Sequence, residues 1–192
     1  APSVQAEPMY GIRAHRSDAD VVRAGGAGAD AGERGIRVIE AGLLATVQDL
    51  GRSGRAAWGI SRSGALDRTA HRRAQRLVGN PEDVAGLEIT LGGFRAVAGA
   101  DLWIALTGAV GPAALDGRPL DRNRPVLWPA GAELDIGWFT AGARAYLAVR
   151  GGVDVPPVAG SRATDTLAGL RPARLATRVG DFVHRQRIHV RA

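Results

Sequence analysis

The chain of 192 residues contains no cysteine and no lysine, so all 25 of its basic side chains are arginine. Without cysteine it can form no disulfide, no zinc–thiolate site, no iron–sulfur cluster and no cysteine nucleophile. Without lysine it can form neither a Schiff base nor the lysine contact of a P-loop. Several large classes of enzyme are therefore excluded before any motif is considered.

Long hydrophobic runs are also missing. No window of about 18 uninterrupted apolar residues occurs, so the sequence predicts no membrane-spanning helix. The segment Ala1–Tyr10 has neither the basic start nor the apolar core of a secretory signal. We therefore expect a cytoplasmic protein that does not contact a membrane.

Aromatic residues are scarce, at 5% of the chain. The formal net charge is +6, but the arginines are scattered rather than interleaved with aromatic side chains, so nucleic-acid binding is not predicted. The four histidines, His15, His71, His184 and His189, do not form a metal-ligand set. We expect all four to be solvated and predict no metal site.

Composition divides the chain into three parts. Residues 1–34 are rich in alanine, glycine, aspartate and arginine, and bury too little apolar surface to offset their ordering entropy, which predicts a disordered tail or linker. Residues 35–170 have the alternation of short apolar runs and turn residues that is typical of a folded domain. Residues 171–192 are dense in arginine and are interpreted as an atypical basic tail, with contact to a polyanion as the alternative.

The domain is expected to be mainly β, because short apolar runs alternate with turn signals from Ile36 onward. The predicted strands cover residues 36–40, 46–49, 87–91, 102–106, 134–136 and 145–149. The pair Asp116-Gly117 predicts a hairpin turn. Pro125 and Pro129 predict an edge strand between them.

One helix is predicted over residues 67–78. Asp67 is suited to the N-cap, and Gly79 followed by Pro81 ends the helix. Apolar side chains recur on one face, at Ala70, Ala74, Leu77 and Val78. The other face is polar and is expected to meet solvent, with His71, Arg72, Arg73, Gln75 and Arg76.

The segment TVQDLGRSGRAAWGISRSGALD, residues 46–67, connects a predicted strand to this helix. It is unusually rich in glycine, serine and arginine, and it ends where the positive end of the helix dipole favours an anion. One interpretation is a glycine-rich surface loop, and the other is the wall of a binding site.

A series of motifs resembles one known family. They are, in order, GLLATVQDLGR (42–52), GISRSGALD (59–67), LVGNPEDVAGLEITLGG (77–93), ALTGA (105–109), ARAYLAVRGGVDVPPVAGSRATD (143–165) and LAGLRPARLA. The family is that of the C subunit of 5-oxoprolinase, also known as allophanate hydrolase subunit 2 and as the antagonist of a sporulation-kinase inhibitor. The chain is also similar to one half of the carboxyltransferase region of urea carboxylase.

The resemblance implies a cyclophilin-like β-barrel, truncated here relative to the two-lobed family domain. It implies ATP-dependent opening of the lactam of 5-oxo-L-proline to give L-glutamate, with the sister B and A subunits as partners and ATP with magnesium as the cosubstrate. One alternative is a carboxyltransferase-like or allophanate hydrolase subunit in urea metabolism, which would use biotin. Another is a non-catalytic module that binds a protein and antagonises a kinase inhibitor.

Two positions depart from the family pattern. Arg62 stands where the family's PSGAMD loop has proline, and Ala163 stands where the family has serine. The family's further motifs beyond position 165 are not found. We therefore expect the chain to be inactive without its partners.

Three carboxylates are candidate catalytic groups. Asp49 could bind substrate or orient an arginine, or it could satisfy N–H groups of the glycine-rich loop. Asp67 could contact a ligand, although capping the helix is the favoured role. Glu88 alternates with its apolar neighbours and could be a general base or an arginine-paired structural residue.

Candidate substrate- or phosphate-binding residues are Ser63, Gly64, Asn80, Thr107, Arg144, Tyr146, Ser161, Arg162 and Asp165. Gly64 would let a ligand approach the backbone while Ser63 offers a hydroxyl. Arg162 is the favoured clamp for a phosphate or carboxylate. The sequence thus predicts that residues 59–67 and 160–165 border one hollow.

Overall fold

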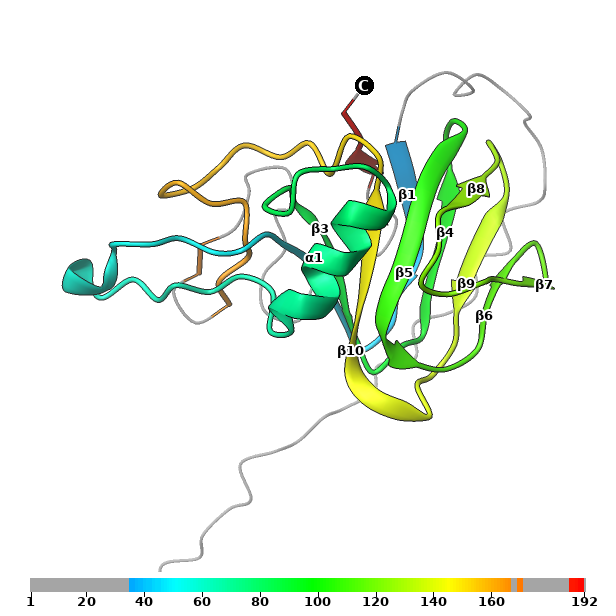
Figure 1. The fold of residues 1–192 in the computed structure, drawn as a ribbon, viewed down its shortest axis with the longest axis horizontal. Coiled ribbons are helices and arrows are strands. Elements are labelled where there is room, and N and C mark those ends of the chain that lie inside the picture. Colours follow the sequence, from blue (N-terminus) through cyan, green and yellow to red (C-terminus); the bar gives the residue numbers. More distant parts are fainter. Residues whose placement is uncertain (1–34, 167–168, 171–186, 192) are drawn as a thin grey trace, which may run out of the picture.

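The computed structural model describes residues 35–166, 169–170 and 187–191. Over this part of the chain the strands form two antiparallel sheets that enclose one hydrophobic core, with one α-helix packed outside them (Figure 1). The predicted mainly β fold with one prominent helix is therefore confirmed. The expectations for residues 1–34 and for most of the basic tail fall outside the described residues.

One sheet has six strands and the other has five. The six-stranded sheet runs in the order β11 (Arg187–His189), β1 (Gly35–Ala41), β4 (Phe94–Ala98), β9 (Glu133–Ile136), β6 (Ala113–Leu115) and β7 (Arg118–Pro119). The five-stranded sheet runs in the order β2 (Leu44–Gln48), β3 (Gly86–Thr90), β10 (Ala141–Val149), β5 (Leu102–Val110) and β8 (Val126–Trp128). A short 3-10 helix, η1, covers Ala56–Trp58.

Alternation explains the six-stranded sheet. In β4 the residues Phe94, Ala96 and Ala98 are buried while the two between them are half-buried, so one face meets the core. All five residues of β3 are buried. The five-stranded sheet is covered on both faces, because a second apolar cluster joins α1 (Arg68–Leu77) to Ala105 and Tyr146 outside the main core.

Local sequence signals predict several turns and strands correctly. Asp116 and Gly117 both have positive φ, at 46° and 74°, in the turn between β6 and β7. The proline-flanked strand β8 lies at the edge of its sheet, as predicted. The sequence did not predict β11, which pairs with β1 and places Ile188 in the core, where it is joined by Val190 just after the strand. The domain therefore includes residues beyond the expected boundary at position 170.

The helix begins and ends as predicted, but the prediction for its polar face is wrong at two positions. Asp67 Oδ1 accepts a hydrogen bond from the backbone N–H of Ala70 at 2.9 Å. His71 and Gln75 are buried, whereas the periodicity predicts that both face solvent. His71 Nε2 lies 3.1 Å from the carbonyl oxygen of Val84, which gives this ring a polar partner under the helix.

Burial of His71 has a measurable consequence. Removal from water lowers the pKa of His71 below its ordinary value of 6.5. The unfolded chain then takes up this proton at a higher pH than the folded chain, so stability is lost as pH falls below about 6.5, by up to about 1.4 kcal/mol per pH unit. Urea unfolding between pH 5 and 7 should show a shallower pH dependence for His71→Gln than for the wild type. Equal pH dependences would contradict a neutral buried His71.

Two long segments project from the same side of the sheets (Figure 1). We call them the first arm (residues 49–66) and the second arm (residues 150–166). The first arm leads from β2 to α1, and its outer tip carries η1 with Trp58 exposed. The second arm follows β10. These arms contain six of the twelve candidate site residues predicted from the sequence.

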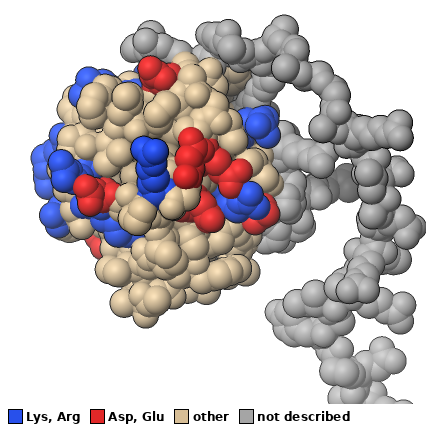
Figure 2. All heavy atoms as spheres, turned by 90° about the vertical axis from the view of Figure 1, so that its right-hand side faces the viewer, with Lys and Arg blue, Asp and Glu red and all other residues tan. Residues whose placement is uncertain are grey.

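One end of the two sheets is apolar and carries no charged residue in its turns. The turns at residues 42–43, 91–93, 110–112 and 137–143 meet there, since Phe139 donates its N–H to Leu91 O at 2.9 Å and Thr140 donates to Val110 O at 2.8 Å. Leu43, Leu91, Val110 and Trp138 are exposed on it. Figure 2 shows this end without arginine or carboxylate atoms, below a face where both signs of charge are mixed. No helix among the described residues is long and apolar enough to cross a membrane.

Candidate functional site

Asp49 joins the two arms at their base. Its Oδ1 accepts hydrogen bonds from Gly51 N at 2.7 Å and Ser161 Oγ at 2.6 Å, and its Oδ2 accepts one from Arg162 N at 2.6 Å. Two of these three donors are backbone N–H groups, so the geometry favours the structural alternative for this carboxylate. Ser161 also accepts from Ala163 N at 2.9 Å, which folds the second arm around the same point.

A second contact between the arms is made by Arg52, which is 2% exposed. Its Nη2 donates to the carbonyl oxygen of Ala163 at 2.5 Å, and its Nη1 lies 3.7 Å from Asp165 Oδ2. Arg52 Nε and Nη1 are buried without a hydrogen-bond partner. Arg52 was not a predicted site residue, because nothing in an arginine-rich sequence distinguishes one buried arginine from the exposed ones.

The glycines of the first arm serve a close backbone contact. A Cβ at Gly51 would lie 2.4 Å from the carbonyl oxygens of Arg62 and Ser63, and a Cβ at Gly64 would lie 2.5 Å from the backbone nitrogen of Gly51. The arm doubles back on itself here, since Arg52 N donates to Arg62 O at 2.8 Å. The sequence predicts that Gly64 admits a ligand, but the space next to its Cα is filled by Gly51.

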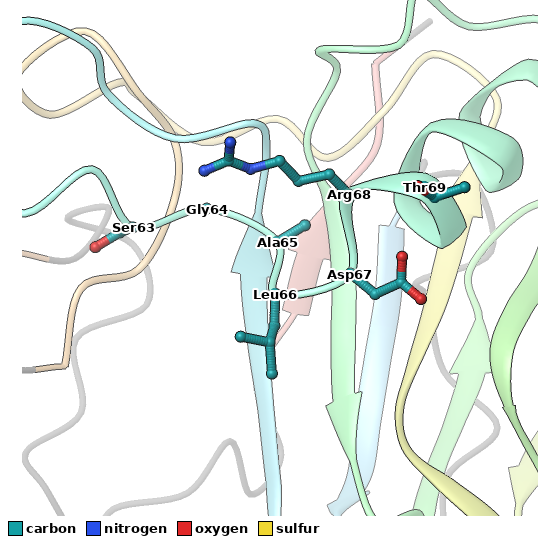
Figure 3. Close-up of a pocket in the computed structure, with 7 residues that line it drawn as sticks. All are labelled: Ser63, Gly64, Ala65, Leu66, Asp67, Arg68 and Thr69. Carbon is teal, nitrogen blue, oxygen red and sulfur yellow. The ribbon is translucent and has the colours of Figure 1, made fainter.

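An open hollow of about 640 Å³ lies where the first arm meets α1, and residues 63–69 line it. In Figure 3 the Arg68 side chain extends back over Gly64 and Ala65, whereas the Asp67 carboxylate points toward the helix that it caps. Leu66 is exposed. The hollow therefore combines a helix N-terminus, a guanidinium, a hydroxyl from Ser63 and apolar surface.

The backbone that lines this hollow is held against the sheet by Glu88 and Tyr146, and Arg144 pairs with Glu88. Glu88 Oε2 accepts from Leu66 N and from Tyr146 Oη, both at 2.8 Å, and Tyr146 Oη accepts from Asp67 N at 2.7 Å. Arg144 Nε lies 3.2 Å from Glu88 Oε1. Burial raises the pKa of Tyr146 above its usual value, so the phenol stays protonated and keeps donating to Glu88. Glu88 is thus paired with an arginine, the second of its two predicted roles.

Asn80 and Thr107 hold the scaffold at other points. Asn80 Nδ2 donates to Val149 O at 2.8 Å, and its Oδ1 accepts from Gly151 N at 2.9 Å, which fixes the start of the second arm. Thr107 Oγ1 donates to Ala70 O at 2.8 Å and is 1% exposed. Neither residue lines the hollow at residues 63–69.

The second arm borders the hollow through polar contacts. Ser61 Oγ lies 2.8 Å from Ser63 Oγ and 2.7 Å from Asp165 Oδ2. Arg162 Nε donates to Val155 O at 2.7 Å. Among the residues that the structure describes, the two terminal nitrogens of Arg162 have no hydrogen-bond partner. The two predicted segments therefore lie side by side, but only the first one lines the hollow. Ser61 was not a predicted site residue, although it stands inside the GISRSGALD motif.

Within the described part of the chain, we compared this place with two alternatives, a metal centre and another hollow. Within residues 35–166, 169–170 and 187–191 no group of three or more histidine, aspartate or glutamate side chains could hold a metal ion. A further hollow of about 500 Å³ is lined by residues of β6–β8 and their connections, and it contains none of the predicted site residues. The first hollow, between the arms and α1, is therefore the candidate site.

Comparison with known proteins agrees with the fold. Residues 58–187 match the family described as carboxyltransferase domain, subdomain A and B. The C subunit of 5-oxoprolinase from Escherichia coli (strain K12) is 45% identical over 135 residues, which cover 70% of this chain and 44% of that protein. Urea amidolyase of Saccharomyces cerevisiae is 38% identical over 136 residues, which cover 70% of this chain and 7% of that protein.

Solved structures agree as well. The urea amidolyase of K. lactis superposes with a TM-score of 0.72 at 31% identity, over 82% of this chain and 9% of that chain. The protein TTHA0988 superposes with a TM-score of 0.73 at 34% identity, over 84% of this chain and 31% of that chain. The chain covers 44% of the Escherichia coli C subunit and 7% of the Saccharomyces cerevisiae urea amidolyase, so it spans less than half the length of both curated relatives.

Proposed function

The chain belongs to the family of carboxyltransferase domains, subdomain A and B, and from this premise we propose that it is a subunit of an ATP-dependent 5-oxoprolinase. The observation that carries the proposal is the 45% identity with the C subunit of 5-oxoprolinase, over 135 residues. The reaction opens the lactam of 5-oxo-L-proline with water to give L-glutamate. An amide carbonyl is a poor electrophile, and ATP would activate its oxygen.

The hollow at residues 63–69 suits the lactam. The N-terminus of α1 and the Arg68 guanidinium favour the carboxylate of 5-oxoproline. Exposed Leu66 offers apolar contact to the ring, and the Ser63 hydroxyl can meet its polar edge. Glu88 and Tyr146 hold the backbone of Leu66 and Asp67 at fixed positions on the sheet, which keeps the hollow preorganised.

ATP would need cationic side chains for its phosphates, and magnesium would need carboxylate ligands. Arg162 does not line the hollow, but the terminal N–H donors of its guanidinium have no partner among the described residues, which suits phosphate charge. Asp49, which accepts from the backbone N–H of Arg162, already accepts three hydrogen bonds, and no metal-ligand cluster converges in the described residues. The residues present do not fit a protein-built magnesium site, so we assign this chain the binding and orientation of the lactam, and derive no phosphoryl-transfer step on it.

Partner subunits are part of the proposal. The relative in Escherichia coli carries the name of one lettered subunit, which supports assembly with sister B and A subunits. The exposed apolar end with Leu91 and Trp138 supports a protein partner, because charge-free apolar surface of this kind is typical of interfaces. The chain alone is accordingly expected to be inactive.

The proposal is tested by reconstitution with the B and A subunits. We expect ATP hydrolysis by the complex to be stimulated by 5-oxo-L-proline. Arg68→Ala should raise the 5-oxo-L-proline concentration needed for half-maximal stimulation at least ten-fold, because a charge-assisted hydrogen bond to the substrate carboxylate is worth about 1.5–3 kcal/mol. Arg124→Ala, in an exposed loop before β8, is the matched control and should leave this concentration unchanged. An ATP hydrolysis rate that is the same with and without 5-oxo-L-proline would refute the proposal.

The urea-metabolism alternative has its own support, the 38% identity with urea amidolyase. Carboxylation of urea that depends on a biotin carrier, with no response to 5-oxoproline, would select it. The kinase-inhibitor alternative predicts a tight complex with a partner protein and no turnover of any substrate. The three functions therefore give three different results in the same reconstituted system.

A further inference from the structure

Three side chains form a hydrogen-bond chain from the hollow into the protein. Ser63 lies at the hollow, Ser61 is 2.8 Å from it, and Asp165 Oδ2 is 2.7 Å from Ser61 Oγ. Asp165 is 3% exposed, and the buried Arg52 lies 3.7 Å from the same oxygen. The inner end of the chain is therefore fixed, while its outer end belongs to a residue that lines the hollow.

The direction of both hydrogen bonds follows from the chemistry of the groups. A carboxylate accepts hydrogen bonds and does not donate them, so the single hydroxyl proton of Ser61 is directed to Asp165. Ser61 Oγ has no second proton, so in its contact with Ser63 it accepts. The hydroxyl proton of Ser63 is thereby committed to Ser61, and only lone pairs of Ser63 Oγ remain for a ligand.

The backbone fixes where those lone pairs lie. Ser63 has φ of 49°, in the left-handed region that serine rarely adopts. The following Gly64 packs against Gly51, so this conformation is held by the doubled-back arm. Such a strained residue beside a hollow has a defined side-chain position, which is what selective hydrogen bonding requires.

We propose that the hydrogen-bond chain from Ser63 through Ser61 to Asp165 makes Ser63 an obligatory acceptor, so that the hollow selects ligands presenting an N–H donor. In the reaction proposed above, that donor is the ring N–H of the lactam, and the inference rests on that function. A lactone of the same shape has a ring oxygen in place of the N–H. The lone pairs of this oxygen would face the lone pairs of Ser63 Oγ, and no hydrogen bond could form. Ser61 and Asp165 are positioning residues, and Ser63 determines specificity.

The test compares 5-oxo-L-proline with its γ-lactone analogue, in which oxygen replaces the ring N–H. Both are measured as competing ligands of the complex with the B and A subunits. We expect the wild type to bind the lactam at least ten-fold more tightly, since the lactone loses this hydrogen bond and brings its ring oxygen against the lone pairs of the half-buried Ser63. Ser61→Ala should reduce this preference at least ten-fold, because the freed Ser63 hydroxyl can rotate and donate to the lactone. Ser63→Ala should reduce it at least as far.

The exposed Ser53 of the same arm supplies the control, and Ser53→Ala should keep the full preference. Thermal unfolding of each variant checks that the arm is intact. If Ser61→Ala keeps the wild-type preference, Ser63 is not oriented by the chain and the inference is overturned. If Ser63→Ala keeps it, Ser63 does not contact the ring and the inference is again overturned.

Failure of the proposed function gives a different result. In that case neither compound binds to the wild-type complex, and the direction of the chain is decided by neutron diffraction of the deuterium-exchanged protein. A deuteron on Ser63 Oγ directed at Ser61 supports the acceptor assignment. A deuteron directed into the hollow overturns it, whatever the ligand proves to be.

Discussion

Gly51→Ala is expected to destabilise the domain far more than Gly54→Ala, although both glycines lie in the first arm with positive φ, at 83° and 72°. Both alanines incur the left-handed backbone cost of about 1–2 kcal/mol. Only at Gly51 would the new Cβ lie 2.4 Å from carbonyl oxygens, whereas at Gly54 nothing lies within 4 Å. We expect the total loss at Gly51 to be on the order of 4 kcal/mol, because two backbone strands must separate.

Urea unfolding of the two variants measures this difference directly. Gly64→Ala provides a second test of the same contact from the other side, since its Cβ would lie 2.5 Å from Gly51 N. Equal losses at Gly51 and Gly54 would show that the first arm does not double back in solution. The hollow at residues 63–69 would then have no fixed wall, and the proposals for Ser63 would fail with it.

The parts of the fold that local chemistry determines could be predicted from the sequence. The helix N-cap at Asp67 and the hairpin turn at Asp116-Gly117 each depend on a few adjacent residues. The start of α1, which borders the hollow, follows from the N-cap signal alone. Strand β11 could not be predicted, because its pairing with β1 joins residues at the two ends of the described chain.

The roles of individual site residues were harder to predict, because they depend on contacts far apart in sequence. Asp49 meets Ser161 and Arg162 across more than a hundred positions, and it is the second arm that completes its hydrogen bonding. His71 follows the helical polar pattern yet is buried, because Val84 folds back under the helix and supplies a carbonyl oxygen. A periodicity of polar residues cannot reveal such a partner.

Ser61 and Arg52 are two site residues that sequence reasoning missed. Both lie within motifs that carry the family resemblance, and neither stands out in the sequence, because arginine is common throughout this chain and Ser61 is one of three serines in the same glycine-rich segment. Their importance comes from Asp165, which lies 2.7 Å from one and 3.7 Å from the other. The arms thus converge on a buried carboxylate that the sequence placed in a different loop.

Arg52→Met should be the most damaging substitution of a charged residue between the arms. Arg52 and Asp165 have side chains 0% and 2% exposed, so removing the guanidinium deprives a buried carboxylate of this cation. Loss of one partner of a buried pair costs about 3–5 kcal/mol. The hydrogen bond from Arg52 Nη2 to Ala163 O is lost as well. We expect a lower urea midpoint and faster proteolysis within both arms.

A double substitution separates charge burial from packing. Arg52→Met combined with Asp165→Asn removes both charges, so it should recover part of the stability lost by Arg52→Met alone, with a coupling of about 1–3 kcal/mol. Arg124→Met, whose partner Asp121 is exposed, is the matched control and should change stability little. If the double variant is no more stable than the single one, the loss comes from packing, and Asp165 is held by contacts other than Arg52. In that case the fixed inner end of the hydrogen-bond chain to Ser63 does not depend on the guanidinium.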